Sequence, residues 1–341
     1  MEFPIDFILT WVDGNDPDWL IEKKKYEGLD PSSSTMSDAN DECRYRENGL
    51  LRFWFRGVEK FAPWVNRIYF VTCGQTPKWL NLDNPKLTFV QHKDFIPKEY
   101  LPTFNANTIE MNFHRISGLA EHFVYFNDDM FLMQPVEEDY FFKDGNPVLD
   151  TIINYPSKSI RQNWMRLLYN DYCTVNKSFH AVESIWKNKD KWFNISILGY
   201  KRVIWNFTKF LTHWSFPVSI FGHLALPHLK SSLVDIWDKQ SELMSMSSSC
   251  RFRSDCQVNQ WLLCAWNQAK GCFYPAHKKQ LGKNIIYSDT NLSAVVDNIQ
   301  TPRFPQICLN EIENNTISDS FTTIICRAFE TILPDKSSFE L

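Results

Sequence analysis

The sequence lacks the excess of basic residues that nucleic-acid binding requires. Its 36 lysines and arginines are outnumbered by 40 aspartates and glutamates, which gives a net charge of −4. A nucleic-acid backbone is bound by a basic surface, and the chain contains no basic run of the needed length. We therefore expect no nucleic-acid partner, and an anionic ligand would have to be held by a local site.

Three further features are missing. No apolar stretch approaches the roughly 18 residues that cross a bilayer. The chain begins M-E-F-P-I-D, without the basic and long apolar segments of a secretory signal peptide. Its nine cysteines form no C-x-x-C pair, and this odd count favours reduced thiols. These absences predict a cytoplasmic protein with no transmembrane segment, and they leave peripheral attachment at the inner face of the membrane open.

What is present is the composition of a folded protein. Hydrophobic residues make up 44% of the chain and charged residues 22%, both ordinary for a globular domain. With 341 residues, the chain is long for a single core but short for two independent domains. We expect one catalytic domain over 1–341, with a polar, mobile loop at 31–43 and a helical insertion at 155–215, which is rich in Trp, Asn and Lys.

Short apolar runs alternate with segments of helical periodicity. The expected strands span 5–12, 67–72, 87–91 and 123–127. The expected helices span 18–28, 47–61, 107–122, 230–246 and 255–269, with one more after about 318. Strands that alternate with helices predict an α/β fold with a mostly parallel sheet whose faces are covered.

Acidic residues follow two of these strands. Asp13 comes directly after the first, and Asp128 and Asp129 follow the strand at 123–127. Ligands of open α/β sheets bind beyond the carboxyl ends of the strands. Carboxylates at that edge can hold Mg²⁺ or Mn²⁺ together with diphosphate oxygens. The alternative is that these residues form turns or helix caps, which Asp also favours.

A histidine and an arginine are further candidates for active-site residues. His228 precedes a helical segment, where it could bond a phosphate or act as a base, although a single histidine is more often structural. Arg253 belongs to the run R-F-R-S-D. The guanidinium suits bidentate phosphate binding, and the alternative for this run is a solvated face.

Four segments in order resemble the conserved blocks of the Stealth family. This family includes bacterial capsular-polysaccharide phosphotransferases and the catalytic subunit of the lysosomal-enzyme N-acetylglucosamine-1-phosphotransferase. The first block is I-D-F-I-L-T-W-V-D-G-N-D-P-D-W at 5–19. The second runs from E-N-G-L-L-R-F-W-F-R at 47 to F-N-D-D-M-F at 131. The third is L-P-H-L at 226–229 with R-F-R-S-D at 251–255, and the fourth is Q-I-C-L-N-E at 306–311.

The resemblance implies a nucleotide-sugar transferase core, GT-A or Rossmann-like, with helical elaborations. It implies transfer of a hexose-1-phosphate, such as N-acetylhexosamine-1-phosphate, from a UDP-sugar to a hydroxyl of a glycan acceptor. UMP would be released, in capsule or surface polysaccharide synthesis. A metal-dependent glycosyltransferase that releases UDP is the alternative, and a carbohydrate-binding protein without activity is a third interpretation.

The resemblance also implies roles for particular residues. Asp129, His228 and Arg253 would be catalytic, with either Asp129 or His228 as the general base. Mg²⁺ or Mn²⁺ would be held by Asp13, Asp129 and Glu311, the last of which stands where the family usually has Asp. The expected donor-binding residues are Trp11, Asp13, Gly14, His114, Arg115, Asn127 and Asp128. For His114 and Arg115, which lie one helix upstream of the acidic strand end, structural packing is the alternative.

Overall fold

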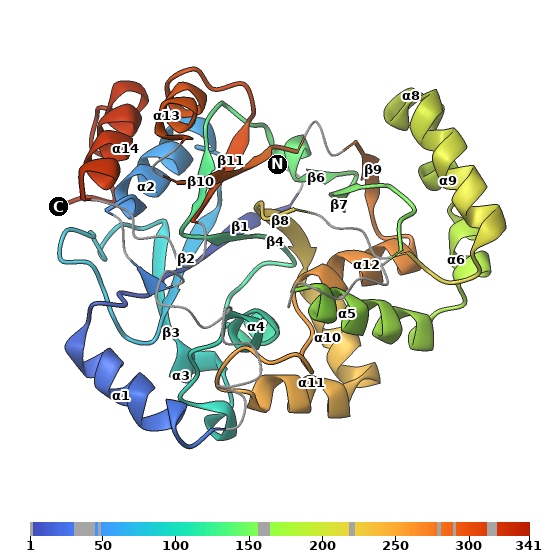
Figure 1. Cartoon of the computed structure of the whole chain (residues 1–341), viewed down its shortest axis with the longest axis horizontal. Coiled ribbons are helices and arrows are strands. Elements are labelled where there is room, and N and C mark those ends of the chain that lie inside the picture. The colour runs from blue at the N-terminus through green and yellow to red at the C-terminus, as the bar shows by residue number, and fades with distance from the viewer. Residues whose placement is uncertain are drawn as a thin grey trace.

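The centre of the molecule is a five-stranded sheet in the order β3-β2-β1-β4-β8 (Figure 1). Its strands are β1 (Ile5–Thr10), β2 (Arg67–Thr72), β3 (Leu87–Gln91), β4 (His122–Asn127) and β8 (Leu226–Leu229). The first four are parallel, and β8 joins β4 in the antiparallel sense. The predicted α/β class with a mostly parallel sheet is therefore confirmed, and the order 3-2-1-4 is that of doubly wound nucleotide-binding sheets.

The structure is a computed structural model, and it describes residues 3–30, 45–46, 49–155, 164–217, 222–277, 281–288, 291–311 and 319–341. The expected mobile loop at 31–43 lies outside these ranges. No helix in the described part of the chain combines the length and the apolar character of a membrane span.

Two smaller sheets adjoin the central one. The first has the order β10-β11-β5, and the second β6-β7-β9. Their strands are β5 (Met130–Leu132), β6 (Phe142–Lys143), β7 (Asn146–Asp150), β9 (Tyr274–Ala276), β10 (Lys283–Tyr287) and β11 (Gln306–Glu311). Only Asp128 and Asp129 lie between β4 of the central sheet and β5 of the sheet that contains β11.

Helices cover both faces of the central sheet. Side chains of β1 alternate between the two faces: Phe7 and Leu9 pack in a core with α2, α13 and α14, whereas Ile8 packs in a core with α5, α10 and α12. These helices are α2 (Leu51–Phe61), α5 (Trp164–Ser178), α10 (Lys230–Lys239), α12 (Trp261–Lys270), α13 (Leu292–Gln300) and α14 (Asp319–Ile332). Burial on both faces explains why β1 is an almost uninterrupted apolar run.

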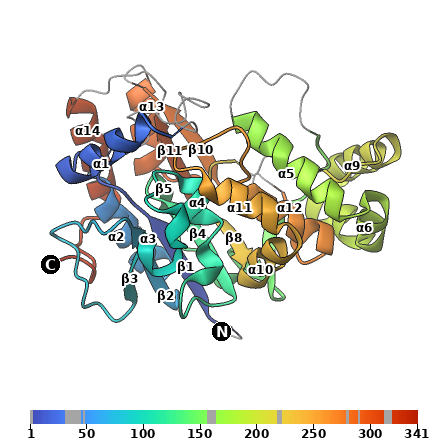
Figure 2. The same cartoon turned by 90° about the horizontal axis from the view of Figure 1, so that it is seen from below.

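The remaining helices lie around this core (Figure 2). Helices fill the described part of the region expected to be helical at 155–215: α5 is followed by α6 (Ala181–Lys187), α7 (Lys189–Trp192), α8 (Ile195–Leu198) and α9 (Tyr200–Thr212). Elsewhere lie α1 (Pro17–Glu27), α3 (His92–Phe95), α4 (Ala106–Glu110) and α11 (Ser241–Ser249), with 3₁₀ turns η4 (Lys98–Tyr100), η5 (Phe113–Arg115) and η6 (Glu138–Tyr140).

The single helix expected over 107–122 is wrong. The structure has the short α4 and then η5, because Asn112 interrupts the helical hydrogen bonds. The side-chain amide of Asn112 donates to the Thr108 carbonyl at 2.8 Å, so the side chain takes the acceptor that the Asn112 backbone N–H would use in a helix. Gly118, at φ 78°, then turns the chain into β4. The helix expected over 230–246 is likewise divided, into α10 and α11 at Gln240, and the one expected from 255 begins only at Trp261.

One carboxyl group, that of Glu110 at the end of α4, is buried in the protein interior and has a shifted pKa. Glu110 is 5% exposed and accepts a hydrogen bond from the Gln260 backbone N–H at 3.2 Å. Burial raises the pKa of Glu110 from 4.5 to about 7, although Arg253 and the Gln260 N–H lower it. Folding therefore favours the protonated carboxyl. The stability that protonated Glu110 contributes is fully present below about pH 4.5 and is lost as the pH rises through about 7.

Glu110→Gln tests this pH dependence, because glutamine keeps the shape and stays neutral. We expect the variant to gain roughly 3 kcal/mol of unfolding free energy over the wild type at about pH 8 and little at about pH 4.5. Urea unfolding across that range measures the difference. Glu99→Gln, at an exposed position, serves as the control and should show no trend. A difference between Glu110→Gln and the wild type that is constant with pH would contradict the assignment.

Candidate active site

The carboxyl ends of β1 and β4 lie side by side at the centre of the main sheet. From β1 the chain proceeds to β2 and β3 on one side and then to β4 on the other, so the strand order reverses between β1 and β4. Such a reversal leaves a crevice at the strand ends, which is where open α/β sheets bind ligands. A cavity of about 200 Å³ lies there. Its lining includes Thr10, Trp11 and Val12 at the end of β1, and Asn127, Asp128 and Asp129 at the end of β4.

The other walls of the cavity come from distant parts of the chain. They are contributed by the described residues before α2, by the segment leading into α4, by His223, by Arg253 and by the ends of β10 and β11. Among these are Tyr45, Arg46, Thr103, Phe104, Asn105, Tyr287, Leu309, Asn310 and Glu311. The cavity thus lies where the central sheet meets the sheet of β10, β11 and β5.

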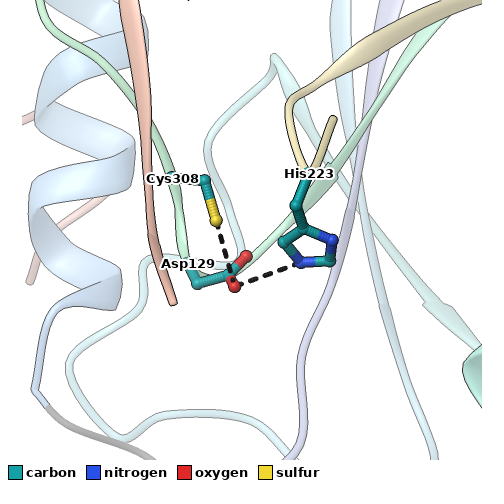
Figure 3. Close-up of side chains that lie close together, drawn as sticks. All are labelled: Asp129, His223 and Cys308. Atoms are coloured by element: carbon teal, nitrogen blue, oxygen red, sulfur yellow. Dashed lines mark hydrogen bonds and ion pairs between the residues drawn. The ribbon is translucent and has the colours of Figure 1, made fainter. Parts of the chain in front are cut away.

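Asp129 is the centre of a hydrogen-bonded group in this cavity (Figure 3). Its Oδ2 lies 3.2 Å from His223 Nε2 and accepts a hydrogen bond from the Cys308 thiol at 3.4 Å. The side-chain amide of Asn127 lies 3.2 Å from the same His223 nitrogen. The backbone carbonyl of Asp129 accepts a hydrogen bond from the Leu309 N–H at 2.9 Å, which ties the aspartate to β11. The carboxylate is therefore fixed from both sheets.

The environment of Asp129 favours its charged form. Burial alone would raise the pKa of the carboxyl, but the attraction and hydrogen bond of His223, with the Cys308 thiol, outweigh it and hold the pKa below its ordinary value. The second oxygen, Oδ1, is buried without a hydrogen-bond partner within the described ranges. Ligand atoms of Asp129, His223 and Cys308 lie within 4.8 Å of one another, which is close enough for one metal ion.

Arg253 reaches the cavity from the loop between α11 and α12, and Asn105 holds that loop. The Asn105 amide donates to the backbone carbonyls of Cys250 and Phe252, each at 2.9 Å. Phe252 is fully buried and stacks on Phe104 with ring centroids 5.2 Å apart. The buried residues Phe104 and Asn105 thus fix the backbone that carries Arg253.

The structure places four more of the predicted site residues in the lining of the cavity. Trp11, Asn127, Asp128 and Glu311 belong to it, together with Asp129 and Arg253. Glu311 accepts a hydrogen bond from Arg46 Nη1 at 2.6 Å, so its carboxylate is bonded to an arginine in this structure.

Asp13 and Gly14 stand just beyond the lining, in the turn after β1. Asp13 Oδ1 accepts a hydrogen bond from the Asn15 N–H at 2.9 Å, and its backbone is held by Gln75. The Gly14 N–H donates to the Tyr45 carbonyl at 2.9 Å, and a Cβ at residue 14 would come within 2.1 Å of that oxygen. A side chain cannot be accommodated there, so the glycine is explained by close packing against Tyr45.

Three predicted residues lie elsewhere. His228 is 1% exposed on β8, where its ring packs on Phe123 and its Nε2 lies 3.4 Å from the Gln260 side-chain oxygen. Burial lowers the pKa of His228 to about 4. His114 and Arg115 both pack against Trp237. The structure brings none of these three side chains into the lining of the cavity.

His223 is the functional candidate that we did not identify in the sequence. It precedes β8 by three residues, and β8 turns back antiparallel along β4, which carries His223 to the Asp129 end of that strand. The sequence F-G-H-L-A-L-P-H-L contains two histidines, five residues apart. Only the pairing of β8 with β4 determines which of the two is buried and which borders the cavity.

The chain is similar to several known proteins. The family models Stealth protein CR1, conserved region 1, and Stealth protein CR2, conserved region 2, match residues 3–30 and 44–149. Capsular polysaccharide phosphotransferase WcwK of Streptococcus pneumoniae is 38% identical over 342 residues, covering 98% of each chain. Receptor polysaccharide phosphotransferase WefC of Streptococcus gordonii is 38% identical over 345 residues, covering 99% of each. Among solved structures, galactosyltransferase LgtC with donor and acceptor sugar analogs matches with a TM-score of 0.39 at 10% identity, over 94% of this chain and 95% of that one.

Proposed function

The chain belongs to the Stealth family and is a transferase of the phosphotransferase class, and from this premise we propose that it moves a hexose-1-phosphate from a UDP-sugar to a hydroxyl of a growing surface or capsular polysaccharide. N-acetylhexosamine-1-phosphate is the proposed group, and UMP is the proposed second product. One observation carries the proposal: a carboxylate–imidazole pair and an arginine line a single cavity at the strand ends of the central sheet.

The proposed reaction is one displacement at phosphorus. The acceptor oxygen attacks the donor phosphorus next to the sugar, and the bond from that phosphorus to the bridging oxygen of the uridine phosphate breaks. A phosphodiester forms, and UMP leaves with the bridging oxygen. Such transfers depend on positioning and on charge neutralisation more than on covalent help from the protein.

His223 is the proposed general base in place of His228. Its ring lines the cavity, and Asp129 holds it by Nε2 at 3.2 Å. With Nε2 fixed by the carboxylate, Nδ1 is the nitrogen that takes the proton from the acceptor hydroxyl, and Asp129 stabilises the imidazolium that results. His228 lacks this setting because it is buried beside a neutral glutamine amide.

Arg253 is the proposed anion-binding group for the phosphate that is transferred. Its planar guanidinium can donate two parallel hydrogen bonds to phosphate oxygens. Asn105 and Phe252 already hold the loop in the structure without substrate, so substrate binding should cost little conformational entropy in this loop.

The oxygen ligands of the cavity fit a hard divalent cation. Asp129 Oδ1 is buried without a hydrogen-bond partner among the described residues, and Asp128 lies beside it in the lining. Mg²⁺ or Mn²⁺ is bound in this way, by one or two carboxylates completed by diphosphate oxygens, and would neutralise charge on the leaving UMP. Cys308 and His223 face the other oxygen, Oδ2, and would suit a softer ion. We assign the ion to Asp129 and Asp128, because Glu311 is bonded to Arg46 and Asp13 lies outside the lining.

Identification of the nucleotide product tests the reaction. With a panel of UDP-sugars and an oligosaccharide acceptor, we expect UMP in the supernatant and a phosphodiester signal in the ³¹P NMR spectrum of the glycan. His223→Asn supplies the background of spontaneous donor breakdown. Release of UDP with no phosphorus in the product would establish the glycosyltransferase alternative instead. Glycan binding without turnover of any donor would favour the carbohydrate-binding interpretation.

A further inference from the structure

Helix α9 presents its apolar side to solvent. Five large side chains recur at the helical spacing of three or four residues, and they are between 46% and 85% exposed. They are Tyr200, Ile204, Phe207, Leu211 and, just past the end of the helix, Trp214. A surface helix of a globular protein normally buries such a stripe against the core. Here the only buried residue of α9 is a polar one, Asn206.

Polar contacts attach the opposite side of α9 to the body of the protein. Asn206 accepts a hydrogen bond from the Ile153 N–H at 2.8 Å and donates to the Trp192 carbonyl at 2.9 Å. Arg202 forms an ion pair with Asp150 at 2.8 Å. These bonds fix the rotation of the helix, so the outward direction of the apolar side is built into the fold.

The exposed apolar surface extends beyond α9. Trp186 of α6 is 53% exposed, and its ring stacks on Phe210. Phe193, directly after α7, contacts both Phe210 and Phe207, so α6, α7 and α9 form one surface. Of the 18 large hydrophobic side chains exposed in the described residues, nine lie between Val182 and Trp214. We call this surface, formed by 182–214, the α6–α9 surface.

The same segment is basic. Residues 181–214 contain six lysines and arginines and two acidic residues, a net charge of +4, in a chain whose total is −4. Lys187, Lys189 and Lys201 are exposed. Both views place α6 and α9 at the outer edge of the molecule, far from α1 and α14 (Figure 1, Figure 2).

We propose that the α6–α9 surface docks the protein on an anionic lipid membrane. A helix with aromatic and aliphatic side chains on one side and lysines beside them lies in the membrane interface, where the apolar groups enter the acyl boundary and the lysines meet anionic headgroups. The positive charge of this surface complements such headgroups. This inference does not depend on the reaction proposed above.

Two other occupants fit the surface less well. A second copy of the chain, paired through a twofold axis, would bring this basic surface, on which Lys187, Lys189 and Lys201 are exposed, against an identical one. A sugar chain would stack on the aromatic rings, but it would gain nothing from Ile204 and Leu211, which are aliphatic and at least 60% exposed.

Vesicle sedimentation of the full-length protein tests the proposal. We expect the wild type to sediment with phosphatidylcholine vesicles that contain phosphatidylglycerol, to bind pure phosphatidylcholine more weakly, and to be released as salt is raised. A triple variant, Ile204→Gln, Leu211→Gln and Trp214→Gln, should lose at least about tenfold in apparent affinity, since three inserted side chains are removed. The control variant carries Leu82→Gln, Ile286→Gln and Ile324→Gln, three exposed hydrophobic residues outside the segment, and should bind as the wild type does.

A second variant tests the electrostatic contribution of the lysines to vesicle binding. Lys187→Gln, Lys189→Gln and Lys201→Gln together should weaken binding to the anionic vesicles and leave binding to neutral vesicles unchanged. Unaltered sedimentation of the Ile204, Leu211 and Trp214 variant would overturn the proposal. Equal binding of the wild type to neutral and anionic vesicles would also overturn it. Two other results, both obtained without lipid, would identify a different occupant. If the wild type forms a dimer that the Ile204, Leu211 and Trp214 variant does not form, the occupant is a second copy of the chain. If the wild type is retained on purified polysaccharide and this variant is not, the occupant is a sugar chain.

Discussion

We expect turnover to fall at least about 100-fold when His223 is replaced by Asn, and the melting temperature to stay close to that of the wild type. A loss of this size is expected when a general base is removed. Asparagine keeps a polar side chain at a position that is one third exposed, so the effect on folding should be small. Asp129→Asn should reduce turnover to a similar extent, because the imidazolium then lacks its negative partner. Turnover with the identified donor and thermal unfolding are to be measured on the same preparations.

His228→Asn is the matched control for His223→Asn. His228 is buried against Phe123 in the core, so shortening it leaves a cavity and lowers the melting temperature. The folded fraction should keep its turnover at temperatures well below unfolding. If the His223→Asn variant is active and the His228→Asn variant is inactive but as stable as the wild type, the general base is His228 and our assignment is wrong.

Arg253→Lys should also reduce turnover at least about 100-fold, although the positive charge is retained. Lysine cannot reproduce the planar pair of N–H groups that a bidentate phosphate contact needs, and the loss of one donor to a developing charge is on this scale. The free energy of unfolding should change little. We expect most of the loss in kcat rather than in KM, because the contact strengthens as phosphorus is attacked.

Arg251→Lys separates this contact from a general effect of the loop. Arg251 lies two residues away, but its side chain packs over Tyr26 and faces Asp30 at 3.6 Å. The Arg251 side chain does not line the cavity, so Arg251→Lys should retain near-normal turnover. If both variants lose activity equally, the guanidinium of Arg253 has no special role and the conformation of the loop is what matters.

The sequence predicted the four parallel strands of the central sheet because each is a largely apolar run, but it did not predict the antiparallel strand β8, and the prediction for β1 extended two residues too far. The ranges predicted for β2 and β3 agree with the structure residue for residue, and the prediction for β4 began one residue late. The strands of the smaller sheets were missed. β10, for example, is only five residues long, and only Ile285 and Tyr287 in it are buried, a pattern too short to distinguish from a loop.

The sequence predicted only the part of the site that directly follows β4. Asp128 and Asp129 follow a strong strand signal, so their place at the sheet edge could be inferred. Cys308 reaches Asp129 because β11 pairs antiparallel with β5, with Cys308 opposite Met130. His223 arrives through the pairing of β8 with β4. Neither register is encoded near the residue itself, because both result from long-range packing of separate segments.

The two-residue connection between β4 and β5 also limits how such a protein can vary in length. Asp128 and Asp129 are the whole connection, and the Leu309 N–H binds the Asp129 carbonyl from the neighbouring strand. A single inserted residue there would rotate the following side chains to the opposite face of β5, because side chains alternate along a strand. The length of this connection is therefore constrained as well as its residues, and insertions should be tolerated better in the helical region between β7 and β8, whose described residues before His223 do not line the cavity.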